Sequence, residues 1–425
     1  MNTAKPGLEP GFVVLVAPSG SYRIAPYVRA AKQLGMQILV VSNSAHSLVS
    51  EVAKGITVDF TDPDQAFALI VDALLSKNVM CILATDDSCV ALCSGVANHF
   101  GLAQNSITAA LLTQRKDLGR DALKKAGRNH PDYQLITLSA IEPGTLTIEF
   151  PIVVKPLGLS ASRGVIRANN KNEFIAACDR IEIILEKTGI TGFNRNNLLV
   201  EAYIDGDEFA VEGFICNGKF HLLTIFDKPE PLTGPFFEET YYLTPSQLNQ
   251  QLKARLVDEV AACCQAYGLE QGPVHAEARI TADGKVVLIE LAARTIGGQC
   301  GQLLEFSLGQ KLEEIIIQGL CGQLPAASEQ KHSAGVLMIP VTKAGILQRI
   351  EGMTEALQVP YIKDLEIHIA PGYELIPLPE GSSYLGFIFA QAPDYKHTYQ
   401  ALKDAYAKLH FVTRPKWTLE PLVSG

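Results

Sequence analysis

Long hydrophobic runs are missing from this chain of 425 residues. No apolar stretch reaches the roughly 20 residues that a membrane-spanning helix needs, and Met1–Gly11 lacks the basic-then-apolar order of a signal peptide. The nine cysteines include no Cys-x-x-Cys pair, which favours reduced thiols over a disulfide framework. We therefore expect a cytoplasmic protein with no membrane partner.

Positive charge is also in short supply. The chain has 36 Lys and Arg against 45 Asp and Glu, a formal net charge of −9. A nucleic-acid binder needs a net basic face, so we expect no nucleic-acid partner. Hydrophobic residues make up 47% of the chain, which is enough to bury a core. At roughly 100–200 residues per domain the length predicts two to four domains, and the composition suits a multidomain enzyme.

The first hundred residues alternate apolar strands with helical patterns. Strands are expected at Phe12–Ala17, Met36–Ser42 and Val79–Thr85, with helices between and after them. Strands separated by helices predict a parallel sheet covered on both faces. The loop after the first strand lies where open α/β sheets bind ligands.

The expected pattern of helices and strands then changes twice along the chain. Ser106–Gly127 is helical and basic, and short strands and hairpins follow, with Asn217-Gly218 as a hairpin turn. A third α+β piece follows Leu324–Ser328. The fold class is therefore α/β plus α+β. The predicted parts are an N-terminal parallel-sheet domain at 1–105, a central domain at 106–325 (subdomains 106–205 and 206–325) and a small C-terminal lobe at 326–425.

The most informative local geometry is in Val274–Arg294. Asp283-Gly284 is expected to form a two-residue hairpin loop, with Ala282 and Lys285 as the first pair. Counting back, Glu277 faces Glu290, with Cβ atoms about 4.5–5.5 Å apart. Like charges in that position need a shared proton, a basic partner or a divalent cation.

Two explanations of this carboxylate pair stay open. Carboxylates that bridge to phosphates are the usual protein ligands of Mg²⁺, which makes Glu277 and Glu290 a predicted metal site. Alternatively, Arg279 or Arg294, on the same face by parity, forms an ion pair with them. His275 faces Ala292 on the carboxylate face and is expected to support the site.

Two lysines lie in contexts that suit phosphate. Lys155 ends the apolar run PIVVK of the expected strand Pro151–Pro156, and the Gly/Ser-rich stretch Leu157–Gly164 follows Pro156. An ammonium beside loop amides can hold phosphate, although no P-loop consensus is present. Lys116 lies on a helix of mixed charge, where a solvated face is the simpler reading. Glu201 and Glu208 flank a Gly turn at strand ends, where carboxylates can accept hydrogen bonds from ribose.

Taken in order, these motifs resemble the ATP-grasp superfamily. They are a helix with Lys116, strand-Lys-Pro at Lys155, the Gly/Ser hairpin, V-E-x-Y-I-x-G-x-E at Val200–Glu208, and E…IELAARxxGG at Glu277–Gly298. The resemblance implies an ATP-grasp fold whose two central subdomains hold ATP. It places Lys116, Lys155, Ser160 and Ser162 on the phosphates, Glu201, Tyr203 and Ile204 on the adenine, Glu208 on the ribose, and Glu277 and Glu290 on Mg²⁺ or Mn²⁺.

One departure narrows the resemblance. Many members have Asn two residues after the second metal-binding Glu, whereas this chain has Ala292, as in the L-amino acid ligase (dipeptide synthetase) branch. There the arginine matching Arg294 is expected to bind the substrate carboxylate and to act in catalysis with Lys155. The substrate side comprises Glu239, for an amino group, together with His275, Arg294, Gly297 and Gly298. Gly297, Gly298 and Gly301 leave room near Arg294 for a side chain.

The resemblance implies an ATP-dependent carboxylate–amine ligase that joins amino acids through an acyl phosphate and uses small-molecule substrates. Homodimers are common in the superfamily, so a homodimer is expected. Rivals are a ligase like glycinamide ribonucleotide synthetase, a biotin-carboxylase-like enzyme, and a non-catalytic nucleotide-binding regulatory module. The module would more plausibly lack one of Lys155, Glu277 or Glu290, and all three are present.

Overall fold

The structure, a computed structural model, describes residues 11–44, 54–141, 144, 146–323, 330 and 332–417. Its chain forms two compact units, each assembled from separate stretches. The first unit comprises Met1–Pro131, Glu208–Phe226 and Leu248–Glu329, and the second comprises Asp132–Asp207, Asp227–Gln247 and Gln330–Gly425. The stretch Leu324–Ser328, used to divide the sequence, lies outside the described residues.

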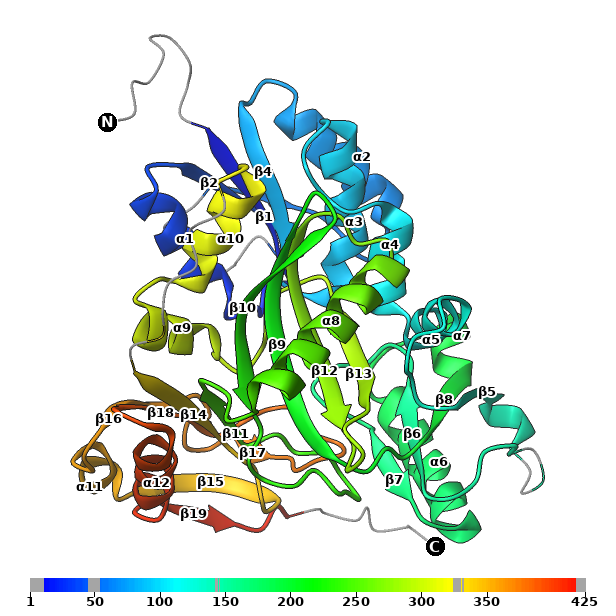
Figure 1. Cartoon of the computed structure of the whole chain (residues 1–425), viewed down its shortest axis with the longest axis vertical. Coiled ribbons are helices and arrows are strands. Elements are labelled where there is room, and N and C mark those ends of the chain that lie inside the picture. Colours follow the sequence, from blue (N-terminus) through cyan, green and yellow to red (C-terminus); the bar gives the residue numbers. More distant parts are fainter. Residues whose placement is uncertain are drawn as a thin grey trace, which may run out of the picture. The chain divides into compact units, whose positions relative to one another are not determined.

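A four-stranded parallel sheet of order β3-β2-β1-β4 begins the first unit (Figure 1). Its strands are β1 (Phe12–Val16), β2 (Gln37–Ser42), β3 (Lys54–Thr57) and β4 (Val79–Ala84). Every residue of β1 is buried, which is why its sequence is apolar throughout rather than alternating. The parallel sheet is confirmed. Strand β3 was not predicted, because it is short and has no buried residue that would produce an apolar run.

Five helices accompany this sheet in sequence. They are α1 (Ile24–Gln33), α2 (Pro63–Leu74), α3 (Asp87–His99), α4 (Ile107–Gln114) and α5 (Lys116–Lys125). Asp62 caps α2 by accepting from the Gln65 N–H at 3.0 Å, with Pro63 in the first turn. The helix expected across Ser106–Gly127 is two helices, because Arg115 adopts an extended backbone between α4 and α5.

An antiparallel set of strands completes the first unit. Its elements are β9 (Asp207–Cys216), β10 (Lys219–Asp227), β12 (Gly272–Ile280), β13 (Val286–Ala292), α8 (Gln250–Ala266), α9 (Gly301–Leu308) and α10 (Leu312–Leu320). One hydrophobic core contains residues of both sheets, among them Val14, Val211 and Ala276, together with Val96 of α3. Helices α1 and α10, far apart in sequence, lie side by side (Figure 1). A shared core explains why the parallel sheet and these strands form one unit.

The second unit holds a four-stranded sheet of order β5-β8-β6-β7. Its elements are β5 (Tyr133–Thr137), β6 (Ile152–Pro156), β7 (Ile166–Ala168), β8 (Asn197–Ala202), α6 (Lys171–Glu186) and α7 (Gly192–Asn196). Ile152, Val154 and Ile166 share a core with Phe174 and Ile181 of α6. Because side chains alternate along a strand, Val153 and Lys155 point away from α6.

The C-terminal lobe is the other part of the second unit. Its elements are β11 (Tyr241–Thr244), β14 (Ser333–Ile339), β15 (Gly345–Glu351), α11 (Met353–Leu357), β16 (Ile362–Ile367), β17 (Glu374–Leu375), β18 (Gly386–Ala392), α12 (Tyr395–Tyr406) and β19 (His410–Arg414). Strands β11, β14, β18 and β16 are neighbours in that order, and β17-β15-β19 form a separate sheet. Helix α12 ends at Tyr406, and His410 pairs with Glu351 in β15.

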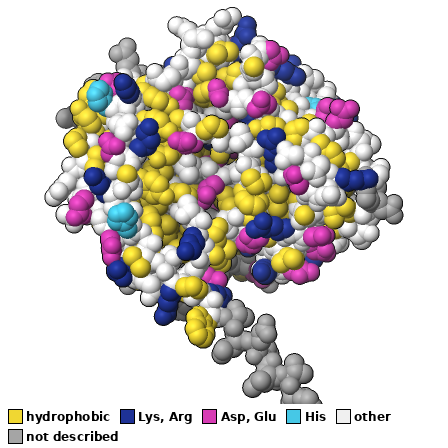
Figure 2. Space-filling model, turned by 90° about the horizontal axis from the view of Figure 1, so that it is seen from below, with side chains coloured by type: hydrophobic (Ala, Val, Ile, Leu, Met, Phe, Trp, Pro, Cys, Tyr) yellow, Lys and Arg dark blue, Asp and Glu magenta, His cyan; other side chains and the backbone are white. Residues whose placement is uncertain are grey.

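The three-part division of the sequence stays a prediction, because the compact units combine its parts differently. Within the described residues, no helix is long and apolar enough to cross a membrane. The face drawn in Figure 2 carries basic and acidic side chains interspersed among apolar ones, in keeping with the mixed composition of the chain.

Candidate active site

Glu277 and Glu290 are paired across β12 and β13, as predicted from the sequence. The predicted turn, however, is wrong. Thr281 and Lys285 close a three-residue loop in which Gly284 has φ +78°, so the first strand pair is Ile280 with Val286.

A bulge in β13 compensates for the extra residue in the loop. Ala278 pairs with Leu288 and Glu277 pairs with Glu290, which leaves Ile289 as the extra residue of a bulge. The Ile289 carbonyl accepts from Arg120 Nη2 at 2.5 Å. The bulge shifts the register by one residue, so His275 also faces Ala292 as predicted.

Cationic groups lie beside both carboxylates. Lys116, at the start of α5, has its Nζ 3.9 Å from Glu290 Oε1, and His275 Nε2 lies 3.4 Å from Glu277 Oε1. Arg279 and Arg294, the alternative partners considered from sequence, instead pair with Glu208 and Asp87. The carboxylates stay partly exposed, Glu277 at 14% and Glu290 at 33%, and can therefore accept a ligand.

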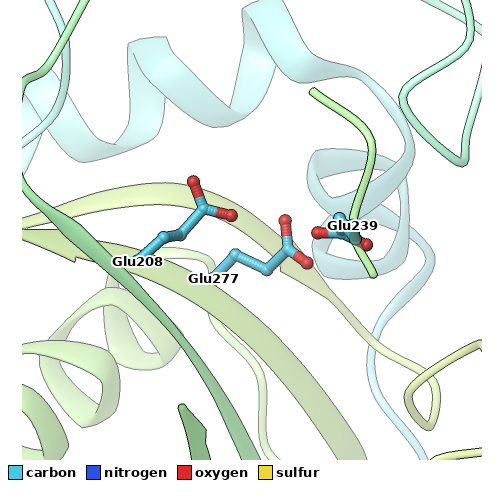
Figure 3. A group of neighbouring side chains, drawn as sticks. All are labelled: Glu208, Glu239 and Glu277. Carbon is cyan, nitrogen blue, oxygen red and sulfur yellow. The ribbon is translucent and has the colours of Figure 1, made fainter. Parts of the chain in front are cut away.

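Glu208 lies on the strand beside Glu277. Both side chains project from neighbouring strands, β9 and β12 (Figure 3), and carboxylate oxygens of the two lie within 4.8 Å of each other. Arg279 Nε donates to Glu208 Oε2 at 2.8 Å. The structure thus brings a third acidic group to the predicted metal pair, already partly neutralised by a buried arginine.

His275 joins the carboxylate pair to a buried glutamate. Its Nδ1 lies 2.6 Å from Glu212 Oε1, and Glu212 Oε2 accepts from the Ile296 N–H at 3.2 Å. Burial by itself lowers the pKa of His275, but the charge of Glu212 and the bonds to both glutamates raise that pKa to about 9. His275 therefore holds Glu277 on one side and, through Glu212, the loop after β13 on the other.

Arg294 lies near the start of that loop and contacts Asp87. Its Nη2 lies 3.0 Å from Asp87 Oδ2, and its Nη1 donates to the Thr295 carbonyl at 3.0 Å. Burial acts to raise the pKa of Asp87, but the charge of Arg294 outweighs it and holds that pKa below its usual range. The second oxygen of Asp87, Oδ1, is buried with no hydrogen-bond partner, a costly condition that a ligand would relieve.

Asp87 was missed by sequence reasoning. It follows β4 at the carboxyl end of the parallel sheet, in Thr85-Asp86-Asp87, where ligand sites of open α/β sheets lie. Its position in the first turn of α3 makes it look like an ordinary helix-start residue. The position of Asp87 after a strand of the parallel sheet was the available signal for a ligand site. Its contact with Arg294 is visible only in the folded chain.

The glycines after Arg294 permit a close approach. A Cβ at Gly297 would lie 3.3 Å from Arg23 Nη2 and 3.6 Å from Tyr22 Oη. Gly298 has φ +59°, which favours glycine. The space at Gly297 is therefore bordered by side chains from the loop after β1, the loop that the sequence marked as ligand-binding.

In the second unit, Lys155 is paired with Glu201. The Lys155 Nζ lies 2.6 Å from Glu201 Oε2, and both side chains are nearly fully buried. Strand pairing explains the contact, because β6 and β8 are neighbours with Val153 opposite Glu201. The two residues were predicted to contact the phosphates and the adenine, and the structure brings them together.

The predicted phosphate loop connects β6 and β7. Ser160 and Ser162 accept from the backbone N–H groups of Arg163 and Val165 through their carbonyls, at 3.3 and 3.1 Å. Ala161 and Ser162 have φ values of +55° and +52°. Such a left-handed backbone in residues other than glycine is strained and is frequent at ligand sites.

Tyr203 and Ile204 follow β8. The Tyr203 N–H donates to the Pro151 carbonyl at 3.0 Å, the Arg167 guanidinium lies 3.9 Å from the centre of the Tyr203 ring, and that ring stacks on Phe237 at 6.5 Å. The segment after β8 is thus held by cation–π and aromatic contacts, which fix the backbone predicted to hold adenine.

Glu239, predicted to hold a substrate amino group, forms an ion pair with the buried Lys228. Lys228 Nζ also lies 5.1 Å from the centre of the Tyr242 ring. Glu239 therefore already has a cationic partner within the second unit.

The predicted residues divide between the two units. The first unit holds Lys116, Glu208, His275, Glu277, Glu290, Arg294, Gly297 and Gly298, and the second holds Lys155, Ser160, Ser162, Glu201, Tyr203, Ile204 and Glu239. Close contacts join Glu208, Glu277, His275, Glu290 and Lys116 into one cluster. Lys155 contacts Glu201. The ligand roles of these residues stay predictions.

Comparisons with known proteins match two parts of the chain. Residues 148–302 match the ATP-grasp domain, and residues 337–414 match L-amino acid ligase C-terminal domain 2. The L-amino acid ligase from Bacillus licheniformis has a similar fold, with a TM-score of 0.80 at 23% identity over 96% of this chain and 100% of that one. That likeness concerns the fold.

Curated relatives are also distant in sequence. The uncharacterized protein y4rH of Sinorhizobium fredii is 25% identical over 86% of this chain and 76% of its own length. The alanine–anticapsin ligase of Bacillus subtilis is 26% identical over 59% of this chain and 54% of its own length. The chain thus spans about half the length of that ligase.

Proposed function

Because the chain carries an ATP-grasp domain and an L-amino acid ligase C-terminal domain, we propose that it is an ATP-dependent carboxylate–amine ligase. It joins the carboxylate of an L-amino acid to an amine, which we take to be a second amino acid. The observation that carries the proposal is the pairing of Glu277 with Glu290 next to Lys116. Facing carboxylates beside a lysine suit a site for nucleotide phosphates and a divalent cation.

The first step transfers the γ-phosphoryl group. A carboxylate oxygen of the substrate attacks the γ-phosphorus, the bond to the β–γ bridging oxygen breaks, and an acyl phosphate and ADP form. Lys116, Lys155 and Arg294 offset the negative charge that develops, and the amides of the phosphate loop hold the phosphate oxygens. Ser160 and Ser162 lie in that loop.

The second step forms the amide. The neutral amine attacks the acyl carbon, the C–O bond to phosphate breaks, and the proton lost from nitrogen leaves with the inorganic phosphate that is released. No nucleophilic side chain of the protein takes part. Water must be kept from the acyl phosphate, and we assign that task to the phosphate loop.

The described residues fit a divalent cation. Glu277 and Glu290 offer hard oxygen ligands that are partly exposed, and Glu208 adds a third carboxylate within 4.8 Å of Glu277. Mg²⁺, with Mn²⁺ as a substitute, would supply positive charge between the nucleotide phosphates. Ala292 in place of Asn leaves any remaining coordination to phosphate and water.

The amino-acid site is proposed at Arg294. The guanidinium binds the carboxylate that becomes phosphorylated, and His275 fixes the surrounding loop through Glu212. Asp87, with its unpartnered buried oxygen beside Arg294, accepts the ammonium group. Glu239 is the sequence-based candidate for the same ammonium, but Lys228 already neutralises it, so we give precedence to Asp87.

Phosphate release across a matrix of amino-acid pairs, with products identified by mass, tests this function. We expect release that requires amino acids, one ADP for each amide, and a product mass equal to the two amino acids minus water. Release that needs bicarbonate and biotin, or a ribose-phosphate amine, would assign the chain to a rival ligase. Nucleotide binding without turnover of any pair would favour the regulatory module.

A further inference from the structure

The phosphate loop contacts one turn of the C-terminal lobe within the second unit. The Gly164 N–H donates to the Pro379 carbonyl at 3.0 Å, and Arg163 Nε donates to the Glu380 carbonyl at 2.8 Å. Ala161 lines a small cavity whose other walls include Gly381 and Ser382–Tyr384. The phosphate loop therefore contacts the turn at Pro379–Tyr384 at Ala161, Arg163 and Gly164.

The side chain of Glu380 reaches a second element. Its Oε1 and Oε2 accept from Nε and Nη2 of Arg180, at 2.6 and 2.9 Å. This two-bond geometry is the strongest form of an arginine–carboxylate contact. Arg180 lies on α6, the helix whose core includes β6 and β7, the strands that carry the phosphate loop. Glu380 thus holds the loop through its carbonyl and the supporting helix through its carboxylate.

Arg180 also contacts the segment before β11. Its guanidinium lies 4.9 Å from the centre of the Phe236 ring, and the Arg167 N–H donates to the Pro235 carbonyl at 2.8 Å. The C-terminal turn, α6 and the segment around Phe236 therefore meet at one arginine.

The backbone of the loop needs external support. Ala161 and Ser162 both adopt φ near +50°, a conformation that persists in such residues only where the surroundings hold it. Successive N–H groups in turns of this kind point into a concavity that binds anions. The conformation suited to phosphate is thus the one that the C-terminal turn supports.

We propose that Glu380 is a positioning residue for the phosphate loop, through which the C-terminal lobe sets the affinity for ATP. The inference rests on the proposed function, because it requires that the loop bind nucleotide phosphates. The Arg180–Glu380 pair is partly exposed, at 44% and 33%, so its contribution is modest. Removing the carboxylate should weaken ATP binding about three- to tenfold.

The test compares E380A with wild type in the full chain. The dissociation constant of a non-hydrolysable ATP analogue, with Mg²⁺, is measured by calorimetry, and steady-state rates are measured at saturating ATP. We expect weaker analogue binding, a raised KM for ATP, and kcat and amino-acid KM within about twofold of wild type. Glu374→Ala is the matched control, because Glu374 forms a similar exposed ion pair in the same lobe, with Lys416 at 2.7 Å.

Tryptic cleavage after Arg163 gives a readout that does not depend on catalysis. E380A should be cut faster than wild type at Arg163–Gly164, ATP should slow the cut in both, and Glu374→Ala should behave as wild type. Analogue affinity and cleavage rate both unchanged in E380A would overturn the inference. If wild type itself fails to bind the analogue, the proposed function fails instead.

Further variants separate a folding defect from loss of the contact. Glu380→Gln keeps hydrogen-bonding capacity but removes the charge, and should show an intermediate loss of affinity at an unchanged melting temperature. If Arg180→Ala and E380A act through one contact, the double variant should lose no more affinity than the stronger single one. Fully additive losses would contradict the proposed contact.

Discussion

Arg294 Nη2 lies 3.0 Å from Asp87 Oδ2, which joins the loop after β13 to the first turn of α3. The two side chains are partly exposed, Arg294 at 12% and Asp87 at 26%, and the other Asp87 oxygen is buried with no hydrogen-bond partner. An α-amino acid carries its carboxylate and its ammonium on the same carbon, so its receptor needs a cation and an anion side by side. This pair supplies both.

Asp87→Asn should raise the KM for the amino acid that is activated. Loss of one charged hydrogen bond to a buried ammonium corresponds to about 10- to 100-fold. Hydroxylamine replaces the second amino acid in this assay, so that only the activated substrate is tested, with hydroxamate as the product. Turnover of the same acid without its amino group should be unchanged. Asp64→Asn, in the first turn of α2 and exposed, is the control.

Glu239→Gln in the same assay decides between the two proposed carboxylates. We expect a smaller change in KM than for Asp87→Asn, because Lys228 already neutralises Glu239. A larger change for Glu239→Gln would return the ammonium site to Glu239. If Asp87→Asn affects only reactions with a second amino acid, Asp87 serves the amine instead.

Glu290→Ala and Lys116→Ala should each abolish ADP formation. The first removes one of two facing carboxylates, and the second removes a cation 3.9 Å from that carboxylate. Rates are measured by coupled ADP detection over a titration of Mg²⁺. Glu290→Asp should need more Mg²⁺ for half-maximal rate, because its shorter side chain withdraws the ligand oxygen. Wild-type activity in Glu290→Ala would mean that the metal assignment is wrong.

Glu201→Gln should destabilise the protein by about 3 kcal/mol, because it leaves the buried Lys155 without its anionic partner. The measurement is urea unfolding without nucleotide, so the result does not depend on activity. Glu173→Gln, fully exposed at the start of α6, is the control. Equal stability of Glu201→Gln and wild type would show that Lys155 is neutralised in another way.

The site is expected to accept side chains larger than a methyl group beside Arg294. Gly297→Ala would place a Cβ 3.3 Å from Arg23 Nη2, so it should lower turnover of larger amino acids more than that of alanine. Products of a panel of single amino acids, identified by mass, provide the comparison. Wild-type turnover of glycine and alanine alone would contradict the expectation.

The carboxylate hairpin was predictable because strand pairing obeys a simple count. Glu277 and Glu290 were found from sequence, yet the loop is one residue longer than predicted and a bulge at Ile289 restores the register. A bulge leaves no clear pattern in an apolar run such as β13, since every residue there is of strand type. The correct pair therefore followed from a count with two compensating errors.

Asp87, Glu212 and Lys228 were not identified because their importance lies in long-range contacts. Glu212 and His275 are distant in sequence, as are Asp87 and Arg294, and no periodicity links them. The contact of the phosphate loop with Pro379 and Glu380 is of the same kind. Such pairs form only when stretches distant in sequence pack against each other.

The sequence by itself determined the elements and their chemistry. Apolar runs located the first strands of the parallel sheet, and motif order along the chain identified the ATP-grasp resemblance, because these signals depend on neighbours in sequence. Tertiary structure decided which charges meet: Arg279 with Glu208, Arg294 with Asp87, and Lys155 with Glu201. Burial makes each such charge require a partner, and which partner is within reach depends on packing, which a linear pattern does not encode.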